Sequence, residues 1–199
     1  SFIIEYGPTS TFGTPGAGAS AGNVNNIVVT ASNVGTKQLT GLSPTTGYSY
    51  VVRQDCTGSA NGYSLNSATI TFMTPPNAPN CTTNISPADG ATGVSPTPNI
   101  PLTWTAAATA TSYDLYLGTT NPPTTLLGNF AGTTVNLTGT SNNNTYYWYV
   151  VPKNAGGSAV GCSSSTTSFS TVIAACTPVT TNGGTVGDAL IDFVLIGEG

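Results

Sequence analysis

The sequence contains no histidine and very little charge. Of its 199 residues, three are Lys or Arg and seven are Asp or Glu, which gives a formal net charge of −4. Without histidine the chain cannot build a Ser-His-Asp or Cys-His catalytic arrangement, or a histidine metal site. Three basic residues cannot form the basic surface that nucleic acid binding requires. We therefore expect no enzyme of these common classes and no nucleic-acid partner.

Long apolar runs and helical periodicity are also missing. No eighteen successive residues are apolar, so no direct membrane span is expected. No run repeats apolar residues at the helical period, whereas Thr, Ser and Asn are abundant beside 24 Gly and 14 Pro. This pattern predicts an all-β protein.

An internal repeat is the strongest feature that is present. Three blocks recur in the same order, at spacings of 111, 99 and 97 residues: "SFIIEYGP" (1–8) and "SYDLYLGT" (112–119), "TGYSYVVRQDC" (46–56) and "TYYWYVVPKNA" (145–155), "ITFMTPP" (70–76) and "TSFSTVI" (167–173). Self-similarity at this length indicates two tandem copies of one domain.

The repeat alignment assigns the aromatic residues of block 145–155 to two faces of a strand. It places Tyr147 and Tyr149 inward with Trp104, and it leaves Tyr146 and Trp148 on the opposite, exposed face. Exposed Trp and Tyr side chains can stack on sugar rings, so Tyr146 and Trp148 are candidate ligand-binding residues. The alternative is cross-strand packing on the sheet, which we favour because no third aromatic residue extends the platform.

The second copy holds a stretch that the first copy lacks. Segments "CTTNISPADGATGV" (81–94) and "NIPLTWTAAATAT" (99–111) predict two β-strands, with Trp104 pointing inward. The first copy starts at the third strand, so we expect its first two strands, about thirty residues by analogy with 81–111, to belong to chain not present here. Alternatively, the tail "ALIDFVLIGEG" (189–199) of another subunit fills the gap by donor-strand exchange. That tail has no tryptophan to replace Trp104, which favours the first reading.

The stretch "LSPTTGY" (42–48) matches the L-x-P-x-T-x-Y entry to strand F of fibronectin type III domains, and the chain resembles a tandem of them. The resemblance implies β-sandwiches and makes Tyr48 a corner tyrosine whose hydroxyl bonds to the backbone. In the second copy Leu137 and Tyr147 are ten residues apart, not six, which predicts a longer loop there. The implied organisation is a partial domain that lacks strands A and B (1–74), a Pro-rich linker (75–80), a complete domain (81–173) and the start of a third β module (174–199).

A set of further blocks resembles modules of large secreted and cell-surface proteins of Bacteroidota: "IEYGPTSTFGTPG", "YVVRQDCTG", "SPADGATGVSPTPNIPLTW" and "YYWYVVPKNAGGSAVGCS". The resemblance implies an extracellular, cell-surface location, type IX secretion, and a structural or adhesive role as spacer, stalk or filament repeat. The alternative function is an accessory carbohydrate- or substrate-binding module of a secreted hydrolase. The expected partners are neighbouring modules of the same polypeptide or filament, and surface glycans are a further candidate.

Four cysteines in a chain that resembles secreted proteins suggest disulfides, with buried free thiols as the alternative. In the resembled fold the start of strand A and the F–G loop share one pole, which brings Cys81 close to Cys162. In the pairs Cys56–Cys81 and Cys162–Cys176, a complete strand would lie between the two cysteines. Such a strand spans about 26 Å, whereas the Cα atoms of a disulfide lie within roughly 7 Å of each other, so these two pairs are not expected. Cys56 and Cys176 would then pair with cysteines outside this segment, or with each other under donor-strand exchange.

The acidic residues suggest at most one cation site. Asp188, Asp192 and Glu198 form the one acidic cluster of the sequence and are a weak Ca²⁺ candidate, since Ca²⁺ prefers several oxygen ligands but no D-x-D-x-D-G spacing is present. No other cofactor is expected. The remaining acids are expected to be solvated surface residues, with Asp114 on an outward strand face: Glu5, Asp55, Asp89 and Asp114.

The linker "TPPNAPNC" (74–81) contains Pro75, Pro76 and Pro79, which restrict the backbone and stiffen the chain. We therefore expect an extended, rod-like pair of domains without a large interface between the sandwiches.

Overall fold

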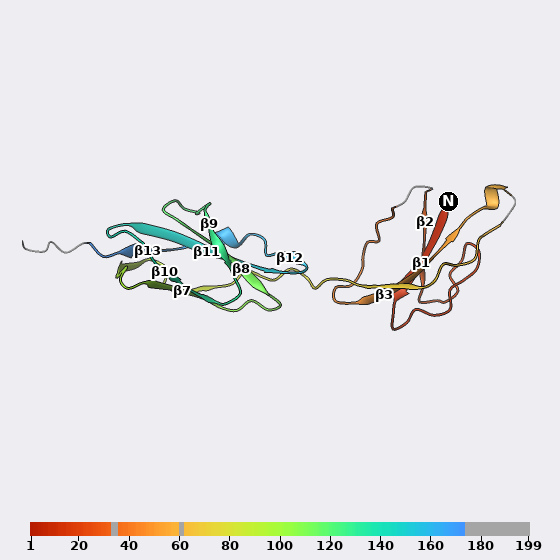
Figure 1. Cartoon of the computed structure of the whole chain (residues 1–199), viewed down its shortest axis with the longest axis horizontal. Coiled ribbons are helices and arrows are strands. Elements are labelled where there is room, and N and C mark those ends of the chain that lie inside the picture. The colour runs from red at the N-terminus through yellow and green to blue at the C-terminus, as the bar shows by residue number, and fades with distance from the viewer. Residues whose placement is uncertain (33–35, 60–61, 174–199) are drawn as a thin grey trace, which may run out of the picture.

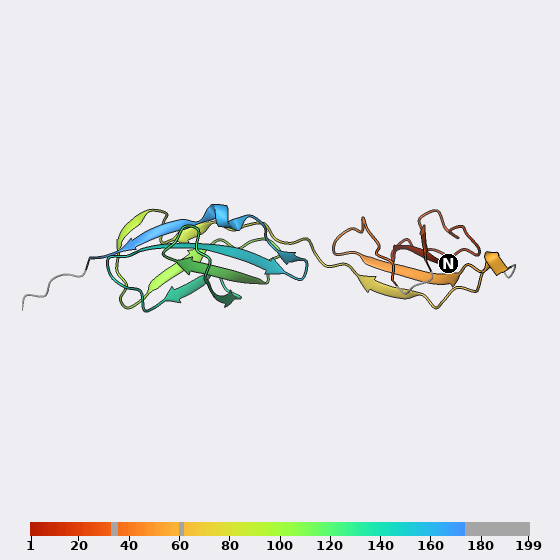
Figure 2. The same cartoon turned by 90° about the horizontal axis from the view of Figure 1, so that it is seen from above.

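The computed structural model describes residues 1–32, 36–59 and 62–173. These residues form two β-rich bodies that lie end to end along the longest axis, joined by one extended stretch of chain (Figures 1 and 2). Apart from two short 3-10 turns, Thr57–Ser59 and Cys162–Ser165, every regular element of the described residues is a β-strand. The chain is all-β, as its composition predicts.

The first domain contains one sheet in its described residues. Its four strands run antiparallel in the order β2-β1-β3-β4, with β1 at Phe2–Pro8, β2 at Ile27–Ala31, β3 at Gly47–Gln54 and β4 at Ile70–Met73. Alternating apolar residues and β-branched or aromatic side chains account for these strands.

The second domain is a sandwich of two sheets. A three-stranded sheet, β10-β7-β5, faces a larger sheet ordered β6-β13-β11-β8-β9, in which β6 pairs with β13 in parallel and β12 pairs with β11. The bounds are β5 Asn84–Ser86, β6 Ala91–Val94, β7 Ile100–Trp104, β8 Ser112–Gly118, β9 Leu126–Phe130, β10 Thr134–Leu137, β11 Thr145–Asn154, β12 Gly157–Ser158 and β13 Thr167–Thr171.

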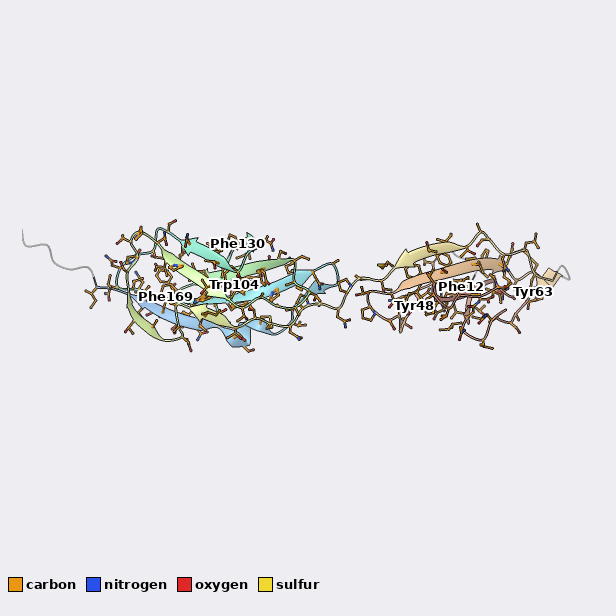
Figure 3. All side chains as sticks on the ribbon, turned by 90° about the horizontal axis from the view of Figure 1, so that it is seen from below. Phe12, Tyr48, Tyr63, Trp104, Phe130 and Phe169 are labelled. Atoms are coloured by element: carbon orange, nitrogen blue, oxygen red, sulfur yellow. A yellow bond between two sulfur atoms is a disulfide. The ribbon has the colours of Figure 1, made fainter. Side chains whose placement is uncertain are left out.

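The core of the second domain lies between its two sheets. Trp104 is buried against Tyr113 and Trp148, with ring centroids 5.7 and 6.5 Å away. Figure 3 shows Trp104 and Phe169 inside this sandwich. Burying each large apolar side chain contributes about 1.5–3 kcal/mol, so the aromatic cluster is a main source of this domain's stability.

The two large sheets have equivalent hydrogen-bond registers, which corrects one part of the repeat alignment. Tyr6 pairs with Tyr50 in the first domain, and Leu117 pairs with Trp148 in the second. The F strands β3 and β11 are therefore related by a shift of 98 residues, not 99. A shift of one residue moves every side chain of a strand to the other face. Contrary to expectation, Trp148 points into the core and Tyr147 and Tyr149 point outward.

The turn that leads into the F strand is the same in both domains. Ser43 donates its amide to the Tyr48 hydroxyl at 2.9 Å, which confirms Tyr48 as a corner tyrosine. Ser141 donates in the same way to Tyr146 at 2.9 Å. Residues with positive φ also correspond: Gly41 and Gly139, Thr45 and Asn143. The prediction of a longer loop in the second domain was wrong, because it took Tyr147 rather than Tyr146 as the corner residue.

Candidate functional site

The proposed sugar-binding residues face the hydrophobic core, Trp148 within it and Tyr146 packed against it. Trp148 is 0% exposed, and Tyr146 stacks on Phe169 with ring centroids 5.5 Å apart. Trp148 is thus closed to any ligand, and Tyr146 is half-buried with one ring face on Phe169, so the prediction of an exposed ligand-binding pair at Tyr146 and Trp148 was wrong. The cause is the one-residue shift in the F strand, which reverses inward and outward positions.

The outward face of β8 and β11 carries two tyrosines that pack on each other. The rings of Tyr116 and Tyr149 lie 4.8 Å apart and are parallel within 2°. Burial and the nearby Tyr116 raise the pKa of the Tyr149 hydroxyl. Each ring covers one face of the other, so this pair is cross-strand packing of the kind that stabilises sheets.

Cys81 and Cys162 form the disulfide that the resemblance implies. Their Cα atoms lie 5.3 Å apart, and the bond joins the chain before β5 to the short turn that precedes β13. Cys56 is a free, half-buried thiol at the start of the corresponding connection in the first domain. Cys176 lies outside the described residues.

The proposed calcium ligands Asp188, Asp192 and Glu198 also lie outside the described residues. Within the described ranges, no group of three or more His, Cys, Asp or Glu residues could hold a metal ion. The same part of the chain contains no helix long and apolar enough to cross a membrane.

Glu5 and Arg53 form a buried ion pair that sequence reasoning missed. The Arg53 guanidinium lies 2.8 Å from the Glu5 carboxylate, and both side chains are 0% exposed. The loop between β1 and β2 covers this ion pair, and the carbonyls of Gly18 and Ser20 in that loop accept hydrogen bonds from Arg53. Asn66 joins the network from the connection to β4. The expectation of a solvated Glu5 was therefore wrong.

The Glu5 carboxylate is fully supplied with donors. Burial by itself raises the pKa of Glu5, but hydrogen bonds from the Asn26 side chain, the Gly22 amide, Arg53 and the Gly16 amide outweigh it, and the net pKa is lowered. A charged carboxylate that accepts several hydrogen bonds is stable even when buried. The network holds a glycine-rich loop against the outer face of the first sheet.

The other acids have ordinary structural roles near the surface. Asp114 points outward from β8, as predicted, and forms an ion pair with the partly exposed Lys153 at 3.0 Å. Asp89 accepts the Ser168 amide. Hydrogen bonds from the side chain and amide of Thr57 lower the pKa of Asp55 to about 2.

The linker between the two domains is held from both sides. On the first domain, the Thr45 amide donates to the Pro75 carbonyl at 3.1 Å. On the second, Asn154 donates its side-chain amide to the Asn77 carbonyl at 2.8 Å. Gly156 lies so close to the linker that an added Cβ would collide with the Pro76 carbonyl oxygen. The linker is thus fixed by hydrogen bonds and close packing as well as by its prolines.

The fold agrees with a known class of sandwich. Among solved structures, the chain is similar to that of the FN1–FN3 domains of chicken CNTN1, with 15% sequence identity and a TM-score of 0.50. The match covers 86% of this chain and 56% of that one, so this chain spans little more than half the length of its structural neighbour. Similarity at this level indicates a fibronectin type III-like fold and no more. No protein-family profile and no curated protein matches the chain.

Proposed function

We propose that this chain is a structural segment of a longer extracellular protein, in which fibronectin type III-like domains act as a stiff spacer or stalk. The observation that carries the proposal is the linker fixed from both sides, through Pro75 on the first domain and through Pro76 and Asn77 on the second. A linker that is only proline-rich limits bending, whereas one that is also bonded to both domains holds them in one orientation. A spacer needs this property, because its function is to keep distance.

An extracellular location is supported by the Cys81–Cys162 disulfide, because disulfides persist mainly in oxidising compartments. The wider role that we propose, as a repeat of an adhesive surface protein or filament exported by the type IX pathway, rests on the sequence resemblance. The accessory-module alternative is weakened, since Trp148 is buried in the core and Tyr146 is half-buried and packed against it.

The stiffness of the junction can be tested with one matched pair of variants. Gly156→Ala should force the linker away from the second domain, because its Cβ would overlap the Pro76 carbonyl. Gly132→Ala is the control, because a Cβ there meets no atom within 4 Å. Small-angle scattering should give the same extended shape for the wild type and Gly132→Ala, and a broader range of dimensions for Gly156→Ala.

A wild-type chain that scatters as a compact globule, or that bends as freely as Gly156→Ala, would contradict the spacer proposal. The size of the natural polypeptide provides a second test. Denaturing, reducing electrophoresis of natural material should give a band several times larger than the 20.0 kDa of this sequence. A band near 20.0 kDa would count against a long repeat protein.

A further inference from the structure

The first domain presents an apolar sheet face whose counterpart in the second domain is sealed. The equivalent registers match Phe2, Ile4 and Tyr6 with Tyr113, Leu115 and Leu117, one residue of each pair lying 111 positions after the other. On the F strands, Tyr50 and Val52 match Trp148 and Val150. On the last strands, Phe72 matches Phe169. The two faces are therefore the same part of the same fold.

The burial of these two faces differs sharply. Tyr113, Leu115, Trp148, Val150 and Phe169 are all buried beneath β7. In the first domain Phe2, Ile4, Tyr50, Val52 and Phe72 are each only partly buried. Of this face, only Tyr6 and Tyr48, beside the corner, are buried.

A hollow of about 320 Å³ marks the open part of the face. Phe2, Ile4 and Val52 line it together with residues of the segment that follows β2: Ala31, Ser32, Thr36 and Lys37. An apolar hollow on a sheet face exposes surface that folded proteins normally cover.

Residues 36–40, which precede the turn at Tyr48, indicate that the open face pairs with a β-strand. Leu39 precedes Tyr48 by nine residues, as Leu137 precedes Tyr146, so residues 36–40 correspond to β10. In the second domain β10 is a strand because it pairs with β7. Residues 36–40 form no strand, and the described part of the first domain offers them no counterpart of β7. Their backbone groups are thus available to pair with an added strand.

Cys56 occupies a place in the first domain like that of Cys162 in the second, but it is not bonded. It follows β3 and directly precedes the turn Thr57–Ser59, while Cys162 begins the turn between β11 and β13. Cys162 is bonded to Cys81, just ahead of β5, whereas Cys56 is a free thiol.

We propose that the open face binds a two-stranded β segment that supplies the counterparts of β5 and β7. Its second strand pairs with residues 36–40, and an aromatic side chain in the position of Trp104 fills the hollow. A cysteine ahead of its first strand is joined to Cys56 by exchange with a donor disulfide, which takes up the two electrons and two protons and leaves as two thiols. The segment belongs to the same polypeptide, as β5 and β7 belong to that of the second domain. Closing this face is a requirement of the fold, so binding of this segment does not depend on whether the protein acts as a spacer.

Residues 81–111 of the same chain can serve as the segment that tests this proposal. Because Ser1 corresponds to Ser112, a second copy of residues 81–111 can be fused directly ahead of Ser1 in its natural register. The control is the same fusion with Leu102→Asp and Trp104→Asp in the added copy, which keeps the length but removes the apolar face. Hydrogen exchange of residues 36–40 and binding of a hydrophobic dye report on the strand pairing and on the open face.

The fusion should slow exchange at residues 36–40 at least tenfold and abolish dye binding, and the control should do neither. Val52→Asp, which places a charge in the hollow, should cancel the gain in the fused chain while changing exchange in the unfused chain little. Loss of the Cys56 thiol in the fused chain supports the cysteine pairing, and a thiol that still reacts contradicts it.

Equal exchange for the fusion and its control would overturn the proposal. It would also be overturned if the unfused chain associated with increasing concentration and residues 36–40 became protected as it did so. In that case a second copy of the chain, and not a segment of the same polypeptide, covers the face.

Discussion

Tyr48 and Tyr146 occupy the same position in the two domains, and each hydroxyl accepts a hydrogen bond at 2.9 Å from the amide of a serine five residues earlier. Each ring stacks on a phenylalanine of the last strand, Phe72 at 5.8 Å and Phe169 at 5.5 Å. Around them, the hydroxyls of Thr74 and Thr171 bond to the backbone of the same turn. The corner is thus one motif, built twice with different residues.

Replacing Tyr146 by Phe should lower the free energy of unfolding of the second domain by about 1 kcal/mol, because the amide of Ser141 loses its acceptor while ring packing is kept. Tyr147→Phe is the control and should change stability by less than about 0.5 kcal/mol, since that side chain points outward. Trp104 and Trp148 are the two tryptophans of the chain and both lie in the second domain, so urea unfolding followed by tryptophan fluorescence measures that domain alone. Equal effects of the two substitutions would contradict the corner assignment.

Removing the disulfide by Cys81→Ala together with Cys162→Ala should destabilise the second domain by about 4 kcal/mol, because the bond closes a loop with a sequence separation of 81 residues. The same tryptophan signal measures the loss. Cys56→Ala is the matched control, and because Cys56 is unbonded and lies in the other domain, it should leave the fluorescence midpoint unchanged. A second domain that unfolds at the same urea concentration with and without its disulfide would show that strain in the bond offsets its entropic effect.

Substituting Glu5 by Gln should destabilise the first domain by about 3–5 kcal/mol, because Arg53 would remain buried without its counter-charge. The control is Asp114→Asn, which breaks a partly exposed ion pair and should cost less than about 1 kcal/mol. Hydrogen exchange in increasing urea measures both effects, at β1 and β3 for Glu5→Gln and at β8 and β11 for the control, which lies in the second domain. A loss no greater than that of the control would argue against a buried, charged pair.

The pH dependence of the first domain should follow from the same carboxylate. The pKa of Glu5 is lowered from its ordinary value of 4.5 in the folded protein. Its contribution to stability is therefore fully present above pH 4.5 and is lost as the pH falls through the lower, folded-state pKa. Between pH 6 and pH 3 the intrinsic rate of amide exchange falls, and in the wild type exchange of β1 and β3 should fall less than that rate does, because protection is lost as Glu5 is protonated. This difference should be much smaller in Glu5→Gln. An identical pH profile in the two proteins would exclude Glu5 as the responsible group.

The tyrosine stack on the second domain predicts a spectroscopic change. The pKa of Tyr149 is raised by burial and by the neighbouring Tyr116. Tyr116→Ala should uncover the Tyr149 ring and return its pKa toward 10.0. Ultraviolet titration of the phenolate band should then show one tyrosine fewer among those that ionise late. Tyr147→Ala is the control, because Tyr147 is not part of the stack, and it should leave the Tyr149 titration unchanged.

Much of this protein could be predicted from the sequence because the relevant signals are local or repeated. The scarcity of helical periodicity indicated an all-β chain, and the recurring blocks indicated two copies of one domain. The motif "LSPTTGY" identified Tyr48, and the resemblance to a known sandwich placed Cys81 beside Cys162. Each of these inferences depends on residue types at short spacings, or on the comparison of one stretch with another.

The tertiary structure decided which face of each strand is inside. Block 145–155 has aromatic or apolar residues on both faces, so alternation fits a shift of 98 or 99 residues equally well, and the cross-strand hydrogen bonds of β8 and β11 select one. The ion pair of Glu5 and Arg53 was likewise invisible in the sequence. It is buried by a loop of Gly, Ala and Ser that has no periodic pattern, and only long-range contacts bring the carbonyls and amides of that loop to the two charges.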